Sequence, residues 1–315
     1  MNVTIMGSGG IGGCIGARLA AGGANVLFLA RGAHLEALQT SGLKLTSALG
    51  DLDLPRVRAQ ENGDGEPSAD FVIFTVKGPQ TVAAAELIAP VVGPNTAIIT
   101  FQNGVEGVDI LQARFGKAAV LPGVTYIAAL IEGPGHIRQI GTVNRSLFGE
   151  TDGSQSTRGL AFRDIANSAG LEMHFVDNIP EELWEKFAML APFTGIACLS
   201  RLPVGTWTRI PETLELFLEG MREVIGLARL KGVELDESRL IPRSTEFVKK
   251  LEPNWKGSML TDLERGKPIE VESLAGYVHR TGKALGFATP FHSTAYRALC
   301  YYAGRNSAPS NSPQS

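Results

Sequence analysis

The sequence predicts an α/β protein of two domains, in which a doubly wound, mostly parallel sheet is followed by an all-helical C-terminal domain. Short β-branched runs alternate with alanine-rich helical stretches from residue 2 to about residue 150, a pattern typical of βαβ units. From Glu181 onward the pattern is helical with few strand signals. We expect domains at 1–177 and 178–303, and a Ser-, Pro- and Asn-rich disordered tail at 304–315.

Each expected strand of the first domain is a short apolar run bounded by Gly, Pro, Asn or Asp. These strands lie at residues 3–6, 26–30, 71–76, 97–101, 119–127 and 146–148, and a helix at 158–169 leads to an edge strand at 172–176. In the second domain the apolar spacing predicts helices at 181–199, 211–231, 238–251, 258–264, 268–285 and 290–302.

The charge pattern excludes several classes of partner. The chain of 315 residues has a formal net charge of −3, and its 29 basic residues are scattered, so we expect neither nucleic acid nor a membrane as a partner. Apolar stretches at 83–92 and 187–199 are interrupted well before the roughly 20 residues that a membrane span needs. The N-terminus begins with strand-forming residues instead of a secretory signal, so we expect a cytoplasmic protein. A homodimer is left open.

The cysteines and histidines give no sign of a metal site. Cys14, Cys198 and Cys300 are odd in number and far apart, which fits neither a disulfide framework nor a Cys-x-x-Cys site, and we expect buried thiols. None of the five histidines has a partner at metal-ligand spacing. We therefore assign the histidines neither a metal nor a catalytic role.

A glycine motif follows the first expected strand directly and opens a helix at 11–21. The motif reads Gly7-Ser8-Gly9-Gly10-Ile11-Gly12 and satisfies G-x-G-x-x-G. Gly7 permits a tight turn, Gly9 lets the backbone approach a pyrophosphate, and Gly12 lets helix and strand pack closely. The helix N-terminus adds N–H donors and a partial positive charge. This context predicts a Rossmann-type dinucleotide-binding domain.

The residue at the end of the second strand indicates which dinucleotide is bound. A domain that binds NAD carries an acidic residue there for the ribose hydroxyls. Here the position holds Arg31, whose guanidinium can pair with a 2′-phosphate. We therefore expect NADPH/NADP as the cofactor. The alternative is that Arg31 is an ordinary solvated surface arginine.

The chain resembles the ketopantoate reductase family (2-dehydropantoate 2-reductases) over about residues 1–300. Besides the glycine motif and Arg31, the resemblance depends on the order and spacing of Thr75-Val76-Lys77, Gln102-Asn103-Gly104, Glu132-Gly133-Pro134-Gly135, Glu185-Lys186, Gly205, Ser258-Met259-Leu260-Thr261-Asp262 and Glu270. It implies NADPH-dependent reduction of a small 2-oxo acid to the 2-hydroxy acid, as in pantothenate biosynthesis. The site would lie in the cleft between the two domains.

The resemblance also implies a role for each matching residue. Lys186 would protonate the developing alkoxide, and Glu270 would hold that lysine and the substrate hydroxyl. Ser258 would bind polar oxygens of the substrate. Lys77 and Asn103 would line the nicotinamide side of the cofactor pocket.

The residues themselves support an acid at position 186. Reduction of a ketone builds negative charge on oxygen, so a positioned proton donor is needed. Lys186 lies at helical spacing with Leu183, Phe187 and Leu190 and so shares an apolar face, where an ammonium is costly without a partner or a task. The alternative is a lysine whose stem lies along the rim of that face.

The other candidates also have purely structural explanations. Ser258 can serve as the N-cap of the helix that follows it. Glu270 can lie near the positive end of a helix dipole, where a negative charge is favourable. Lys77 precedes Gly-Pro and can be a surface turn residue, and Asn103 can be a turn residue with left-handed backbone. The positions of Lys77 and Asn103 after parallel strands favour ligand contact.

The chain departs from the family pattern at two positions. After the lysine the family carries asparagines at the fourth and the eighth following positions, where this chain has Leu190 and Thr194. Both positions are expected to line the substrate pocket. A site that loses hydrogen-bonding groups binds a hydroxyl-bearing substrate less well. We therefore expect a 2-oxo acid with a less polar tail than ketopantoate.

The sequence is also compatible with two other functions. The same fold can reduce an imine, as opine-type dehydrogenases do, or serve as a non-catalytic NADPH sensor. A sensor needs no proton donor at the hydride end, so Lys186 and Glu270 argue against it.

Overall fold

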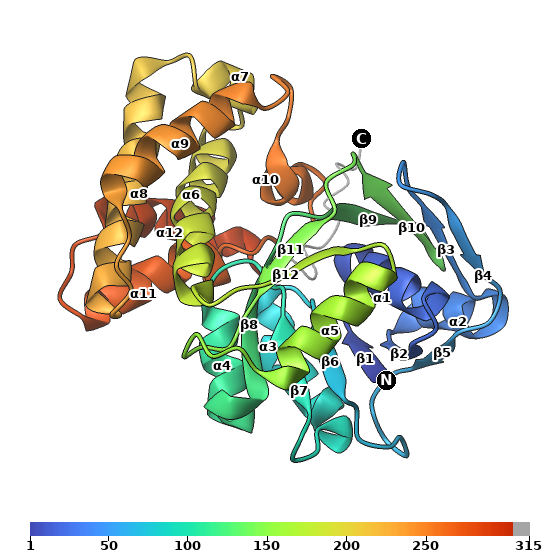
Figure 1. Ribbon diagram of the computed structural model, residues 1–315. Coiled ribbons are helices and arrows are strands. Elements are labelled where there is room, and N and C mark those ends of the chain that lie inside the picture. Colours follow the sequence, from blue (N-terminus) through green and yellow to red (C-terminus); the bar gives the residue numbers. More distant parts are fainter. Residues whose placement is uncertain (305–315) are drawn as a thin grey trace, which may run out of the picture. The chain divides into compact units, whose positions relative to one another are not determined.

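The computed structural model describes residues 1–304 (Figure 1). The backbone contacts form two compact units, one from Met1 to Leu183 and another that begins at Trp184. The division falls inside one long helix, a few residues after the expected domain limit at 177, which stays a prediction. The expected tail lies outside the described residues except for Gly304.

The first unit contains a predominantly parallel sheet with the strand order β12-β11-β8-β7-β6-β1-β2-β5 (Figure 1). Only the pair of β8 and β11 is antiparallel within this sheet. The strands are β1 (Asn2–Met6), β2 (Asn25–Leu29), β5 (Arg58–Gln60), β6 (Phe71–Phe74), β7 (Ala97–Thr100), β8 (Val120–Thr125), β11 (Arg145–Phe148) and β12 (Glu172–Phe175). The doubly wound sheet expected from the sequence is confirmed.

Helices cover both faces of this sheet because its strands are apolar on both sides. Ile5 and Ile73 belong to one buried cluster with residues of α1 and α5, whereas Val72 and Phe74 belong to another with residues of α3 and α4. The helices are α1 (Gly10–Ala21), α2 (Gly32–Ser41), α3 (Thr81–Ile88), α4 (Glu106–Phe115) and α5 (Thr157–Ser168), with short 3-10 turns η1 (Gly78–Gln80), η2 (Ala89–Val91) and η3 (Lys117–Ala119).

A separate four-stranded sheet in the first unit was not predicted. Its order is β4-β3-β10-β9, formed by β3 (Leu43–Thr46), β4 (Leu52–Leu54), β9 (Ala128–Gly133) and β10 (His136–Ile140). The strand expected at 119–127 is present but shorter: β8 spans Val120–Thr125, and the chain enters the second sheet at Ala128. The strands of this sheet are short, and the apolar residues that open β9 are largely exposed, unlike those of a buried strand.

The second unit is helical throughout its described part, as expected. Its elements are α6 (Ile179–Ser200, which starts in the first unit), α7 (Val204–Trp207), α8 (Pro211–Leu230), α9 (Glu237–Lys250), α10 (Gly257–Glu264), the π-helical turn η4 (Glu272–Gly276), α11 (Tyr277–Ala284), α12 (Pro290–Leu299) and the 3-10 turn η5 (Cys300–Tyr302). The expected helix at 268–285 starts later, at Glu272, and its first five residues form the wider π turn. Helix α7 was not predicted.

A buried carboxylate fixes the start of α12. Glu223 on α8 accepts hydrogen bonds from the backbone N–H groups of Phe291 and His292, at 2.7 and 3.1 Å, and from Nδ1 of His292 at 2.7 Å. The side chain of His292 is fully buried. Glu223 thus satisfies N–H groups that would have no partner inside the helix itself.

Candidate functional site

The turn after β1 has the geometry that the glycine motif predicts. Gly7 has φ +89°, and a Cβ there would lie 2.8 Å from atoms of Val76. A Cβ on Gly12 would lie 2.3 Å from the carbonyl oxygen of Gly7 and 2.4 Å from Oγ1 of Thr75. A Cβ on Gly9 would meet only the end of one side chain, at 4.0 Å. The turn therefore packs tightly against the sheet while the space over Gly9 stays open.

The first turn of α1 offers an anion its main-chain amides. Gly9 is the N-cap, no side chain caps it, and the first turn holds no acidic residue. The partial positive charge of the helix start is therefore not neutralised locally. Gly10 is required for a different reason, since its Cβ would lie 2.1 Å from the carbonyl oxygen of Ala129 in β9. Ile11 is partly buried against the core.

Ser8 holds the glycine turn against β2. Its backbone N–H donates to the carbonyl of Leu29 at 3.2 Å. Its hydroxyl donates to the carbonyl of Leu29 at 3.0 Å, and its side chain is 3% exposed. The hydroxyl donor is thus engaged by the last residue of β2. This bond anchors the turn after β1 to the neighbouring strand.

The other predicted cofactor residues follow the carboxyl ends of neighbouring strands. Arg31 follows β2, is exposed, and is the N-cap residue of α2. Lys77 follows β6 and is exposed, and Asn103 follows β7 and is partly buried. Because β7, β6, β1 and β2 are adjacent and parallel, these residues and the glycine turn lie along one edge of the sheet. Open α/β sheets bind ligands at that edge.

Three polar side chains that had no predicted role hold these loops together. Thr75 Oγ1 donates to the carbonyl of Gly7 at 2.8 Å. Gln102 Nε2 donates to the carbonyl of Val76 at 2.9 Å, which joins the loops after β6 and β7. His34, to which the sequence assigned nothing, contacts the carbonyl of Ser8 at 2.8 Å. Thr75 and Gln102 lie within two of the motifs on which the family resemblance depends, whereas no sequence signal pointed to His34.

In the second unit, helix α6 carries the predicted acid. Lys186 keeps part of its surface exposed, yet the protein surrounds it closely enough that burial lowers its pKa to about 8, while the negative charge of Glu270 acts to raise it. Trp184 and Phe187 lie on either side of it in the sequence, with ring centroids 5.7 Å apart, and Tyr277 packs 6.0 Å from Phe187. Burial of this kind favours the neutral amine over the ammonium.

Glu270 lies immediately before the π turn. The residue is 9% exposed, and its carbonyl accepts a hydrogen bond of 3.2 Å from Ser273 Oγ. The N–H of Gly276 donates to the carbonyl of Val271 at 2.8 Å, which is the wide bond of a π turn. The predicted pair of Lys186 and Glu270 is thus within electrostatic range inside one unit.

The predicted substrate residues have different environments. Leu190 is partly buried, and Thr194 is 5% exposed with its hydroxyl donating to the carbonyl of Ala191 at 3.0 Å. Ser258 is exposed in the first turn of α10, whose N-cap is Lys256. The N-cap explanation for Ser258 is therefore wrong: the helix begins at Gly257, one residue before this serine, so Ser258 has no capping position.

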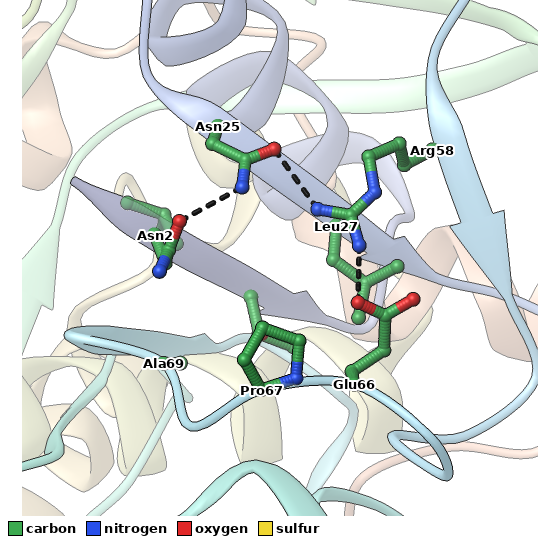
Figure 2. Close-up of a pocket in the computed structure, with 9 residues that line it drawn as sticks. Asn2, Asn25, Leu27, Arg58, Glu66, Pro67 and Ala69 are labelled. Carbon is green, nitrogen blue, oxygen red and sulfur yellow. Dashed lines mark hydrogen bonds and ion pairs between the residues drawn. The ribbon is translucent and has the colours of Figure 1, made fainter.

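A small cavity elsewhere in the first unit can be set aside. Figure 2 shows Asn2 and Asn25, the first residues of β1 and β2, and the ion pair of Arg58 with Glu66 around it. Its volume is about 10 Å³, room for roughly one water molecule. It lies at the amino ends of the strands, the edge opposite the glycine turn.

Metal-binding clusters and membrane-spanning helices are both absent from residues 1–304. Among these residues no group of three or more His, Cys, Asp or Glu side chains could hold a metal ion. None of the helices in the described chain is both long and apolar enough to span a bilayer.

Comparison with known proteins identifies the family. Residues 3–153 match the family model "Ketopantoate reductase PanE/ApbA", and residues 178–302 match the model for its C-terminal part. A 2-dehydropantoate 2-reductase from Mesorhizobium japonicum is 31% identical, over 92% of this chain and 94% of that protein. The chain belongs to the ketopantoate reductase family. It is therefore a member of an oxidoreductase family that reduces 2-oxo acids with nicotinamide cofactors.

Solved structures agree with this fold. The crystal structure of a PanE/ApbA family ketopantoate reductase from Ralstonia eutropha is 28% identical, covers 96% of this chain and 98% of its own, and superposes with a TM-score of 0.87. A D-mandelate dehydrogenase solved with NADH and anilino(oxo)acetate has a TM-score of 0.86 at 20% identity, over 96% of this chain and 98% of its own. At that identity the likeness concerns the fold. The α/β and helical architecture of the ketopantoate reductase family is thus shared.

Proposed function

We propose that this protein uses NADPH to reduce the keto group of a 2-oxo acid, with Lys186 as the general acid. Bound NADPH would supply a hydride to the keto carbon. The observation that carries the proposal is the pairing of Lys186, with its pKa lowered to about 8, with the buried carboxylate of Glu270. A proton donor is most effective when its pKa lies near the working pH.

The chain's own residues account for the remaining requirements. The amides at the start of α1, over which Gly9 leaves space, would bind the pyrophosphate. Arg31 would pair with the 2′-phosphate, which favours NADPH over NADH. Lys77 and Asn103, on the same edge of the sheet, would line the nicotinamide side. We also propose that the functional domains are 1–177 and 178–303.

The proton transfer follows from the charge that develops. As the keto oxygen becomes an alkoxide, the ammonium of Lys186 would donate its proton to that oxygen, leaving a neutral amine and a 2-hydroxy acid. Glu270 would hold the ammonium in its charged form before transfer, because a nearby negative charge favours it. Ser258 would contact polar oxygens of the substrate from the exposed first turn of α10.

We propose further that the substrate is less polar than ketopantoate. Leu190 offers no hydrogen bond, and the hydroxyl donor of Thr194 is already engaged by its own helix. A pocket with these two side chains gains little from a hydroxylated tail. The D-mandelate dehydrogenase of the same fold was solved with an aromatic oxo acid, anilino(oxo)acetate, which makes aromatic 2-oxo acids sensible members of the test panel.

The test is a panel of 2-oxo acids with the purified protein. Ketopantoate, aliphatic and aromatic 2-oxo acids are assayed with NADPH and with NADH, by the loss of reduced-nicotinamide absorbance. We expect turnover with NADPH and the highest kcat/KM for an apolar 2-oxo acid. A clear preference for ketopantoate would refute the substrate proposal. Turnover that appears only after an amine is added would indicate imine reduction, and NADPH binding without any turnover would indicate a sensor.

A further inference from the structure

His34 joins the glycine turn to a hairpin of the second sheet. It lies on α2 and is partly buried. Its Nε2 is 2.8 Å from the carbonyl oxygen of Ser8, and the backbone N–H of Gly135 donates to its Nδ1 at 3.1 Å. Gly135 lies between β9 and β10. One imidazole on α2 therefore contacts two segments that are far apart in the sequence.

These two contacts fix where the ring carries its hydrogen. A backbone N–H can only donate, so Nδ1 must present its lone pair to Gly135. The hydrogen of the neutral ring is then on Nε2, which donates to the carbonyl of Ser8. Burial lowers the pKa of His34, while the bond to Ser8 acts to raise it. A neutral ring of this tautomer satisfies both bonds.

The bond to Ser8 also determines the direction of the next amide group. The structure contains no cis peptide among its described residues, so the Ser8–Gly9 peptide is trans. In a planar trans peptide the C=O and the N–H point in opposite directions. Because the Ser8 carbonyl is held toward His34, the N–H of Gly9 points away from α2. Gly9 is the N-cap of α1 and the residue over which space is open.

We propose that His34 is a positioning residue for dinucleotide binding, which turns the Ser8–Gly9 peptide so that the Gly9 N–H faces the pyrophosphate. This inference rests on the proposed NADPH binding. His34 touches no reacting atom. Without His34 the Ser8–Gly9 peptide can rotate in the free protein, so the Gly9 N–H no longer has a fixed direction. Binding of the dinucleotide must then fix that direction, which costs conformational entropy. The effect falls on cofactor affinity and leaves proton transfer at Lys186 unchanged.

Two variants separate this role from a purely structural one. His34→Leu removes both hydrogen bonds. His34→Gln keeps an N–H donor for Ser8 and a carbonyl acceptor for Gly135 on one planar group and cannot be protonated. The matched control is His174→Leu, which changes an exposed histidine of β12 in the same unit.

The readouts are the Kd for NADPH from fluorescence titration without substrate, and KM and kcat for the reduction. For His34→Leu we expect Kd and KM for NADPH to rise about tenfold, the order expected when one oriented hydrogen bond is lost, with kcat at saturation unchanged. His34→Gln should restore most of the affinity, and His174→Leu should match wild type. The inference is overturned if His34→Leu has the same Kd for NADPH as wild type. It is also overturned if His34→Gln binds NADPH as weakly as His34→Leu.

A measurement on the wild-type protein covers the case in which His34→Leu does not fold. The imidazole ¹⁵N chemical shifts of His34 report which nitrogen carries the hydrogen, and we expect the Nε2–H form; a ring protonated at Nδ1 would refute the geometry. If wild type binds neither NADPH nor NADH, the proposed function fails. If wild type binds NADPH and His34→Leu binds it equally well, only the role of His34 fails.

Discussion

The hydroxyl of Thr75 donates a hydrogen bond of 2.8 Å to the carbonyl of Gly7, so the loop after β6 holds the turn after β1. The same hydroxyl would lie 2.4 Å from a Cβ on Gly12. Helix α1 can approach the sheet this closely only because position 12 has no side chain. The close packing of the turn depends on Gly12, whereas the open space depends on Gly9, so substitutions at these two glycines should have different effects.

Gly12→Ala and Gly9→Ala should fail in different ways. Gly12→Ala places a methyl against the backbone of Gly7, and we expect a loss of about 1–3 kcal/mol in the free energy of unfolding. Gly9→Ala meets no close atom of the protein, so Tm should stay near that of wild type while NADPH binding weakens. Thermal melts and NADPH titrations check both. Gly133→Ala, with nothing within 4 Å, is the control. A Gly9 variant that binds NADPH normally contradicts the proposed position of the pyrophosphate.

Lys186→Met should remove the general acid while leaving the nucleotide site intact. We expect kcat to fall by about 10²–10⁴-fold, the range for loss of such a group, with Kd for NADPH unchanged. Stopped-flow reduction and NADPH titration give the two quantities. Lys283→Met, an exposed lysine at the end of α11, is the matched control. Wild-type kcat in the Lys186 variant would show that another group donates the proton.

The pH dependence of the reduction should report the same lysine. Burial lowers the pKa of Lys186 to about 8, and only the protonated amine can donate. We therefore expect kcat/KM of the reduction to decrease as pH rises through about 8, and kcat/KM of the reverse oxidation, which needs the neutral amine, to increase. Measurement of kcat/KM for the 2-oxo acid across this range tests the assignment, because this ratio reports the pKa of the protein before the 2-oxo acid binds. A kcat/KM of the reduction that stays constant to well above that value contradicts it.

Arg31→Ala should act on the choice of cofactor. A charge-assisted bond to a phosphate contributes roughly 1.5–3 kcal/mol, so we expect KM for NADPH to rise by about 10- to 100-fold. KM for NADH should change little, because NADH lacks the 2′-phosphate. Steady-state kinetics with both cofactors measure the ratio. Equal losses with the two cofactors would place Arg31 outside the 2′-phosphate site.

Stability below neutral pH should depend on His292. Burial lowers the pKa of this fully buried histidine, and Glu223 acts to raise it. In the unfolded chain His292 therefore binds a proton near pH 6.5, whereas in the folded chain it stays neutral at that pH. As a result this group's contribution to stability falls as pH decreases below that value, by up to about 1.4 kcal/mol per pH unit. His292→Asn retains a donor for Glu223 and should show a flatter pH profile in urea unfolding, whereas His174→Asn should follow wild type.

Much of the fold could be predicted because apolar periodicity and glycines act locally. The parallel strands, the glycine turn and most helices of the second unit lie close to their expected bounds. The four-stranded sheet could not be predicted. It joins β3 and β4 to β9 and β10 by pairing residues such as Lys44 and His136, and strand pairing between such distant parts of the chain leaves no local signal.

The candidate site was predictable where motif and topology agree. Arg31, Lys77 and Asn103 follow strands that the sequence located, so their common edge followed from the parallel order. His34 was missed because its partners are two backbone groups, the carbonyl of Ser8 and the N–H of Gly135. Backbone partners have no residue type, so sequence spacing cannot reveal them.

Helix α1 has a sheet on either side of it. A Cβ on Gly10 would lie 2.1 Å from the carbonyl oxygen of Ala129, and one on Gly13 would lie 2.7 Å from Ile137. The end of the helix that follows the glycine turn therefore has little freedom to shift before a ligand arrives. Such a preorganised receptor loses little entropy on complex formation. Nucleotide uptake should accordingly proceed without a slow isomerisation of the loop, as a single kinetic phase linear in nucleotide concentration.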